Sequence, residues 1–249
     1  MELIGFVVWE VVKVIGLVVL GLFSVKGMTA LAFRRGWIKI ALYALILVMA
    51  GVGAWEVGND VAAEVYLRSC SSNLARGDLV NAYSNAILAI HLRPTNLSYW
   101  RALVQTKMRL QQLQSALDDE PTMQAISKGQ LDEEAEYQFT LCQYFLGQYA
   151  QVVATTLRLT RENPSYAAPY VLRGLAYTAQ KKYLEAQQSF LAVLQIFPNN
   201  QAAVEGLAQA FYLAGDRQRA LAVLHETWRF PFSASARERF EALAGLYEQ

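Results

Sequence analysis

The chain has 249 residues, of which 54% are hydrophobic, and its 22 basic and 21 acidic side chains leave a formal net charge of +1 at pH 7. A near-neutral chain without a basic stripe argues against nucleic-acid binding. With two histidines, two cysteines and no phosphate-binding loop, nucleophile elbow or zinc motif, the sequence predicts a protein that is not an enzyme. We expect no cofactor, no metal and no small-molecule substrate.

The first 55 residues contain two apolar segments. Residues 3–23 are interrupted only by Glu10 and Lys13, and residues 38–55 are uncharged after Lys39. As helices they would span about 31 and 27 Å, close to the roughly 30 Å hydrocarbon core of a bilayer. They predict two transmembrane helices, because a signal peptide would have a basic residue in front and no second segment behind. The alternative is that the first segment inserts only partly or lies in the interface.

The two charges of the first segment are three residues apart, so they share one helix face and can pair. A charge at bilayer depth costs about 2.5–3.5 kcal/mol, and such residues usually face protein instead of lipid. We predict that Glu10 and Lys13 form an intramembrane docking face for a partner protein, with Gly16 allowing close approach. The alternative is that the pair satisfies itself or meets the second helix of the same chain.

The connection between the two segments, residues 24–37, is basic, whereas the chain after the second segment is acidic. The basic residues up to the start of the second segment are Lys26, Arg34, Arg35 and Lys39, and the acids that follow it are Glu56, Asp60 and Glu64. Because basic loops stay in the cytoplasm, we predict a cytoplasmic connection in an integral inner-membrane protein. Both termini and the remaining domain would then be outside, which is the periplasm in a bacterium.

The rest of the chain repeats itself at a period of 34 residues. Landmarks one period apart are Ala82 and Ala116, Pro164 and Pro198, and Ala186 and Ala220. The predicted units are residues 63–96, 97–132, 133–166, 167–200 and 201–234. One such unit cannot bury its apolar face alone, so the units are expected to stack. The predicted fold is therefore all-α: two transmembrane helices in the anchor, residues 1–55, then an α-solenoid of about five helix hairpins and a capping helix at 235–249.

A short tether, residues 56–62, is expected between the anchor and the first unit. Only about five of these residues, Glu56 to Asp60, separate the second apolar segment from the first repeat, and extended they reach less than about 20 Å, which would keep the solenoid against the membrane. Within the second unit, the run from Asp118 to Pro121 predicts a broken or shifted second helix. Cys70 and Cys142 are expected to be core thiols on the order of 20 Å apart, too far for a disulfide.

The fourth unit carries a recognisable set of residues at fixed positions, namely Tyr170, Gly174, Tyr177, Ala186, Phe190 and Pro198. In this pattern the chain resembles the tetratricopeptide repeat family over residues 63–234. The resemblance implies that the first helix of each repeat lines a concave groove, which suits an extended peptide or a helix. The lysine-and-asparagine clamp of some members of that family is absent.

The resemblance assigns the groove residue by residue. The main predicted groove residues are Leu67, Arg68, Arg101, Gln105, Arg109, Tyr137, Leu141, Tyr144, Val171, Leu175 and Tyr212, accompanied by Ser71, Met108, Thr178, Glu205 and Gln209. The groove is expected to be basic near the anchor and apolar or aromatic further along. The alternative is that several of these side chains are buried between repeats.

Two functions fit these predictions. The first is a membrane-anchored scaffold or accessory subunit that binds and stabilises protein partners in a larger membrane complex. The second is a periplasmic assembly factor or chaperone that holds client polypeptides, similar to the tetratricopeptide proteins of cytochrome c maturation. The expected partners in both cases are other proteins. We favour the first because of the charged face in the first segment and the short tether.

Overall fold

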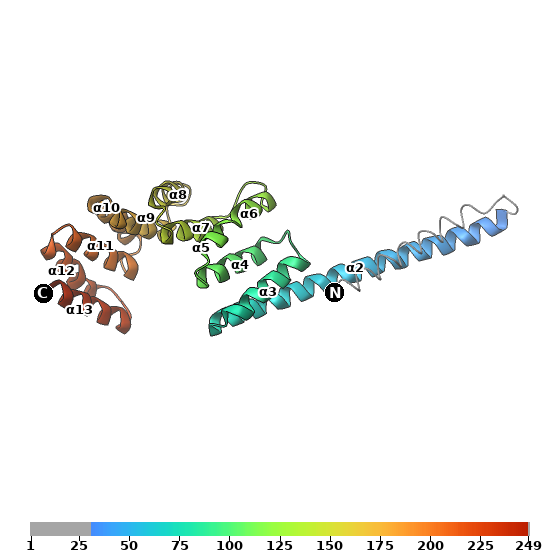
Figure 1. Ribbon diagram of the computed structural model, residues 1–249, viewed down its shortest axis with the longest axis horizontal. Helices are drawn as coiled ribbons and strands as arrows, with labels where there is room; N and C mark the ends of the chain where they lie inside the picture. Colours follow the sequence, from blue (N-terminus) through green and yellow to red (C-terminus); the bar gives the residue numbers. More distant parts are fainter. Residues whose placement is uncertain (1–30, 249) are drawn as a thin grey trace. The chain divides into compact units, whose positions relative to one another are not determined.

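The computed structural model describes residues 31–248, and the chain divides into two units, residues 1–65 and residues 66–249 (Figure 1). Within the described residues the fold is all-α, as predicted. The first predicted transmembrane segment, residues 3–23, lies outside the described range. So do the predicted intramembrane docking residues Glu10, Lys13 and Gly16.

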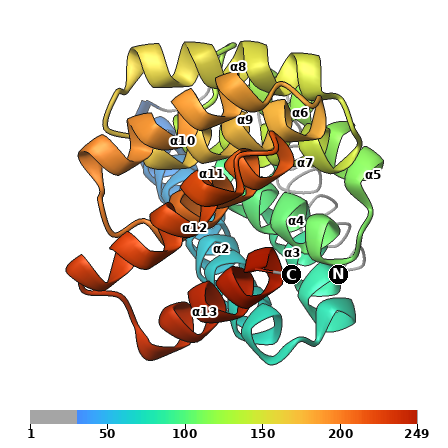
Figure 2. The same ribbon diagram turned by 90° about the vertical axis from the view of Figure 1, so that its left-hand side faces the viewer.

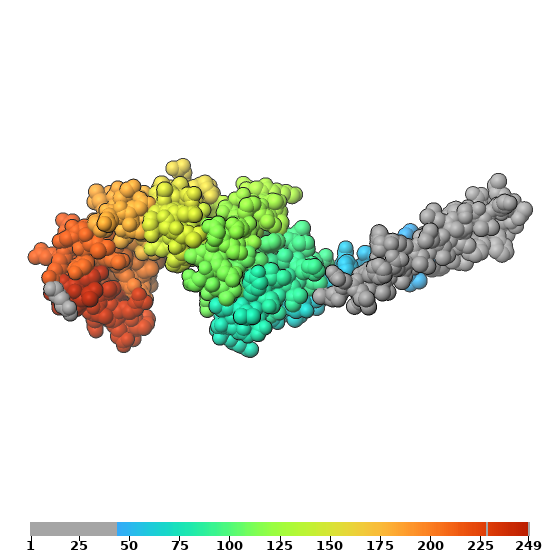
Figure 3. Space-filling view, in the orientation of Figure 1, coloured from blue at the N-terminus to red at the C-terminus, as the bar shows by residue number. Residues whose placement is uncertain are grey.

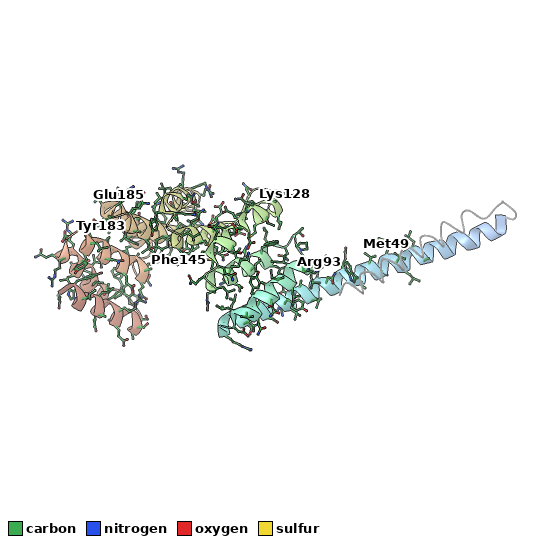
Figure 4. The ribbon with its side chains drawn as sticks, in the orientation of Figure 1. Met49, Arg93, Lys128, Phe145, Tyr183 and Glu185 are labelled. Atoms are coloured by element: carbon green, nitrogen blue, oxygen red, sulfur yellow. The ribbon has the colours of Figure 1, made fainter. Side chains whose placement is uncertain are left out.

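The first unit is described through one long helix, α2 (Leu31–Arg76), whose 46 residues also enter the second unit. Its stretch Ala44–Arg76 contains an 18-residue window with a mean hydropathy of 1.3, none of which is buried. Leu47 is 72% exposed there, and Met49, which is labelled in Figure 4, is 65% exposed. By length and composition, this is the one helix among the described residues that is suited to cross a membrane.

Residues 56–62, which we expected as a short tether between the anchor and the first repeat, lie within α2 and are helical. The sequence Glu56-Val-Gly-Asn-Asp-Val-Ala62 has no proline, and its one glycine, Gly58, costs a helix only about 1 kcal/mol. Seven helical residues rise about 10 Å. The helix therefore continues directly into the first hairpin of the second unit.

The second unit is a series of helix hairpins in which most helices pack on the ones before and after them along the chain (Figures 1 and 2). The end of α2 packs on α3 (Leu79–Leu92) and α4 (Leu97–Arg109) through a cluster that contains Cys70, Ala82 and Leu103. The later helices are α7 (Glu133–Phe145), α8 (Tyr149–Glu162), α9 (Ala167–Ala179), α10 (Tyr183–Ile196), α11 (Gln201–Leu213) and α12 (Arg217–Glu226). A short 3-10 turn, η1 (Thr227–Arg229), leads to α13 (Ala234–Glu248).

The expected break in the second hairpin is confirmed. Its second helix is reduced to α5 (Leu113–Leu117), and a separate short helix, α6 (Glu120–Ile126), follows it. The buried ammonium of Lys107, on α4, holds this break in place. Its Nζ atom lies 2.5 Å from a carboxylate oxygen of Asp119 and donates to the carbonyl of Ser115 at 3.0 Å.

The turns between the two helices of each hairpin share one backbone conformation. A left-handed residue ends the first helix at Gly77 (φ 79°), Gln111 (60°), Gly147 (77°), Lys181 (60°) and Gly215 (85°). At Lys181, the amide of Lys182 donates to the carbonyl of Tyr177, five residues earlier, which closes the helix end. The turn geometry thus recurs with the repeat even where glycine does not.

The core of the second unit is divided into clusters between successive hairpins. In the space-filling view of Figure 3, the colours of the second unit follow one another in sequence order along its surface. Phe190 of α10 is completely buried between α9 and α11. Its ring packs against Gly174 and Gly206, where any added Cβ atom would lie 2.6 and 2.4 Å from it. Glycine at both positions is therefore required by the close approach of this ring.

Candidate functional site

Five predicted groove residues of the third and fourth hairpins lie on the neighbouring helices α7 and α9, and we call them the apolar strip. Tyr137, Leu141 and Tyr144 lie on one face of α7, because residues four and three apart share a helix face. They pack against Leu172 and Ala176 of the neighbouring helix α9. On α9 itself the strip continues with Val171 and Leu175, which pack against the cluster around Phe190.

All five residues of the apolar strip, Tyr137, Leu141, Tyr144, Val171 and Leu175, are half-buried. Each one belongs in part to the core between hairpins, which is the alternative that the sequence left open. Each also keeps part of its side chain at the surface. The strip is therefore a fixed apolar surface whose side chains are held by core packing, and a ligand can contact it without reordering them.

The far end of the strip is more exposed than the strip itself. Phe145, the last residue of α7, is 59% exposed and meets Tyr144 edge to face at 5.5 Å between ring centroids (Figure 4). The equivalent residue at the end of α11, Leu213, is 43% exposed. Phe145 and Leu213 are two 34-residue periods apart, so they occupy equivalent positions of the repeat. The sequence analysis did not include either residue in the groove, although this spacing relates them.

Tyr212 of α11 is 39% exposed, but one face of its ring is covered. Tyr247 of α13 stacks on it with 4.2 Å between centroids and an interplanar angle of 12°. On the same two helices, Glu205 pairs with Arg239 at 2.9 Å. The last helix, α13, therefore packs on α11 and covers one face of the Tyr212 ring.

At the other end of the strip, an open hollow of about 690 Å³ is present beside the start of α7. It is lined by Arg101, Leu131, Asp132, Glu133, Glu134 and Tyr166. The ring of Tyr166 lies 5.8 Å from that of Tyr137, measured between centroids. The hollow and the apolar strip therefore adjoin each other.

The charge of this hollow differs from the sequence-based expectation. Arg101, predicted to make this end of the groove basic, forms an ion pair with Asp132. Asp132 also caps α7 by accepting a hydrogen bond from the amide of Ala135 at 2.9 Å. Since the pair cancels the charge of Arg101, the sign of the hollow is set by Glu133 and Glu134, and it is negative.

The two glutamates have neutral hydrogen-bond donors as their partners. Asn163 Nδ2 donates to Glu133 at 2.8 Å, and the hydroxyl of Tyr166 donates to Glu134 at 3.1 Å. Burial, and after it the negative charge of Glu134, raises the pKa of Tyr166 above its usual value, and the pKa of Tyr137 is raised by the same two causes. Both phenols therefore remain protonated at neutral pH.

Four other predicted groove residues lie outside both the apolar strip and the hollow. Leu67 packs into the cluster between α2, α3 and α4, while Arg68, Gln105 and Arg109 are exposed on α2 and α4. Among the described residues, no group of three or more His, Cys, Asp or Glu side chains is placed to hold a metal ion.

Cys70 and Cys142 are free and buried. Burial raises the pKa of the Cys142 thiol to about 11, so this thiol is uncharged and a poor nucleophile at neutral pH.

Comparison with known proteins agrees with this architecture. A family model described as tetratricopeptide repeat matches residues 177–230. No curated protein sequence matches the chain. Among solved structures, a thermophilic tetratricopeptide repeat protein of Thermus thermophilus is similar with a TM-score of 0.60 and 21% identity, over 74% of this chain and 100% of that one.

Two further structures show the same likeness at lower identity. MamA from Desulfovibrio magneticus RS-1, in a form that runs from residue 41 to the end, has a TM-score of 0.58 and 15% identity, over 68% of this chain and 94% of that one. YrrB, described as a tetratricopeptide repeat protein with an unusual peptide-binding site, has a TM-score of 0.53 and 14% identity, over 71% of this chain and 90% of that one. The predicted helical solenoid of tetratricopeptide type is thus confirmed as the fold of this protein.

Proposed function

We propose that this protein is a membrane-anchored scaffold, an accessory subunit that binds and stabilises protein partners in a larger membrane complex. The observation that carries the proposal is the direct continuation of an apolar, unburied helix, α2, into hairpins that present a half-buried apolar strip. The first feature supports attachment to a bilayer. The second supports docking of another polypeptide.

The membrane part of the proposal is supported by the exposure of α2. Leu45, Leu47, Met49, Trp55 and Val57 are all exposed and point in different directions around the helix. A helix that is apolar on every side is stable when protein or lipid surrounds it, and here the described residues do not cover it. All backbone groups within a helix are satisfied internally, as a hydrocarbon environment requires.

Alkaline extraction of bacterial membranes that contain the full chain tests this anchoring. We expect the protein to remain in the membrane fraction at pH 11, because apolar burial in lipid does not depend on charge. Alkaline phosphatase fused after Gln249 is expected to be active, which reports a periplasmic repeat domain and a cytoplasmic connection between the predicted membrane segments. Release of the chain into the soluble fraction, or an inactive fusion, would contradict the anchor or the topology respectively.

The docking part of the proposal is tested at Phe145, which lies at the exposed end of the apolar strip. We expect Phe145→Glu to reduce the co-purification of partner proteins in mild detergent by about tenfold, because an exposed aromatic anchor is replaced by a charge. Leu184→Glu is the matched control. Leu184 is 65% exposed at the start of α10, between Tyr183 and Glu185, which are labelled in Figure 4.

The same purification separates the two candidate functions. Recovery of a partner at constant stoichiometry supports the accessory subunit, whereas recovery that follows the supply of newly made client supports the assembly factor. Equal recovery with Phe145→Glu and with wild type would show that partners bind elsewhere on the chain.

A further inference from the structure

The hollow beside α7 gives the apolar strip a chemically distinct end. Tyr166 lines the hollow, and its ring lies 5.8 Å from that of Tyr137, the first residue of the strip. A polypeptide lying along the strip toward this end would therefore place its next side chain in the hollow. The chemistry of the hollow then decides which side chain is accepted there.

The hollow carries negative charge that its own partners leave uncompensated. Glu133 and Glu134 receive hydrogen bonds only from the neutral donors Asn163 and Tyr166 among the described residues. A carboxylate has about four acceptor positions, so both groups keep capacity for a further donor. The start of α7 contributes about half a positive charge through its dipole, which offsets only part of two carboxylates.

A metal ion is not a suitable occupant of this hollow. The carboxylates of Asp132, Glu133 and Glu134 do not form a group that could hold a metal. One of them, Asp132, is already engaged by Arg101 and by the backbone amide of Ala135. A cationic group with several directional donors, such as an ammonium or a guanidinium, matches two separated carboxylates better.

We propose that the strip and the hollow together bind a protein segment in which apolar side chains are followed by a lysine or an arginine. The apolar side chains lie on Tyr137, Leu141 and Tyr144. The cationic group enters the hollow and donates to Glu133 and Glu134, with its aliphatic stem against the ring of Tyr166. This inference rests on the proposed docking function and adds the chemistry of the partner.

The experiment uses random dodecapeptides displayed on phage and the full chain in detergent micelles. Selection is run in parallel against wild type, against Glu133→Gln/Glu134→Gln and against the matched control Glu238→Gln/Glu241→Gln. The control changes two exposed glutamates of α13 in the same way. Circular dichroism checks that the three proteins keep the same helix content.

We expect peptides selected on wild type and on the control to be enriched in lysine or arginine next to apolar residues. On Glu133→Gln/Glu134→Gln this enrichment is lost. In the best selected peptide, replacement of the basic residue by norleucine should weaken binding to wild type about two- to fivefold, the range of an exposed ion pair. The peptide change leaves the protein untouched, so a folding defect in the variant cannot produce this result.

The possible failures have different meanings. Selected peptides that bind wild type equally well with lysine or norleucine overturn the inference but leave the docking function intact. Basic peptides that bind Glu133→Gln/Glu134→Gln as tightly as wild type place the cation elsewhere and also overturn it. If no peptide from the library binds the wild-type chain, both the inference and the proposed docking function fail.

Discussion

At the scale of single residues, the turn positions show how strongly the repeat constrains the backbone. Gln111 and Lys181 adopt φ values of 60°, the conformation that Gly77, Gly147 and Gly215 supply in the other hairpins. For a residue with a Cβ atom this left-handed conformation costs about 1–2 kcal/mol. Neighbouring hairpins therefore impose a conformation that the local residue does not prefer.

Replacing Lys181 by glycine is expected to stabilise the protein. Relief of the left-handed strain exceeds the added entropy of the unfolded chain, so the free energy of unfolding should rise by about 0.5–1 kcal/mol. Thermal unfolding of the full chain in detergent, followed by circular dichroism, measures the effect. The reverse change, Gly147→Ala, should lower stability by a similar amount, since no atom lies within 4 Å of the added methyl and only the backbone is strained.

At the scale of elements, the close contact of α9, α10 and α11 is set by one aromatic ring. Phe190 is completely buried, and the two helices beside it meet the ring through Gly174 and Gly206. Burial of an aromatic side chain supplies one of the larger apolar contributions to stability. The pairing of a large residue on one helix with glycines on its neighbours therefore determines how closely the fourth and fifth hairpins pack.

Gly206→Ala should separate these helices. Its Cβ atom would lie 2.4 Å from the Phe190 ring, so we expect a loss of about 1–3 kcal/mol in the free energy of unfolding. The double variant Gly206→Ala/Phe190→Leu should recover part of the loss, because the smaller side chain leaves room for the methyl group. The control Gly245→Ala, in open space on α13, should be neutral or stabilising by up to about 1 kcal/mol.

At the scale of the whole molecule, the described part of the second unit is a linear series in which helices contact mainly their neighbours along the chain. Stability in such a series is close to a sum of hairpin and interface contributions. The C-terminal end is closed by α13, through the stack of Tyr247 on Tyr212 and the ion pair of Arg239 with Glu205. A substitution in α13 should therefore destabilise the neighbouring helices and leave the distant hairpins unaffected.

Tyr247→Ala tests this locality. We expect faster hydrogen exchange in α11, α12 and α13, and unchanged exchange in α3 and α4, because the lost contacts belong to the last hairpin. Leu246→Ala is the matched control, since Leu246 is 58% exposed and makes no such stack. Faster exchange throughout the second unit would instead mean that the whole unit unfolds cooperatively.

Local features of the fold could be predicted from the order of the residues. The 34-residue period, the two-helix units and the broken helix after Asp118 depend on turn residues and apolar spacing within a few tens of residues. The structure adds that the expected tether, residues 56–62, is helical, because neither its acidic residues nor Gly58 prevents a helix. The membrane topology and the docking role of Glu10 and Lys13 stay predictions.

Contacts between residues that are far apart in the sequence decided the charge and the exposure of the candidate site. From the sequence Arg101 is a free basic groove residue, and only the fold shows that Asp132, 31 positions away, pairs with it. Likewise, Tyr212 is covered by Tyr247, and the apolar strip is half-buried because α7 and α9 pack side by side. Helix formation depends mainly on residues that are near one another in the sequence. The exposure of a side chain and the net charge of a site depend on every group that folding brings close to them, so only the tertiary structure decides them.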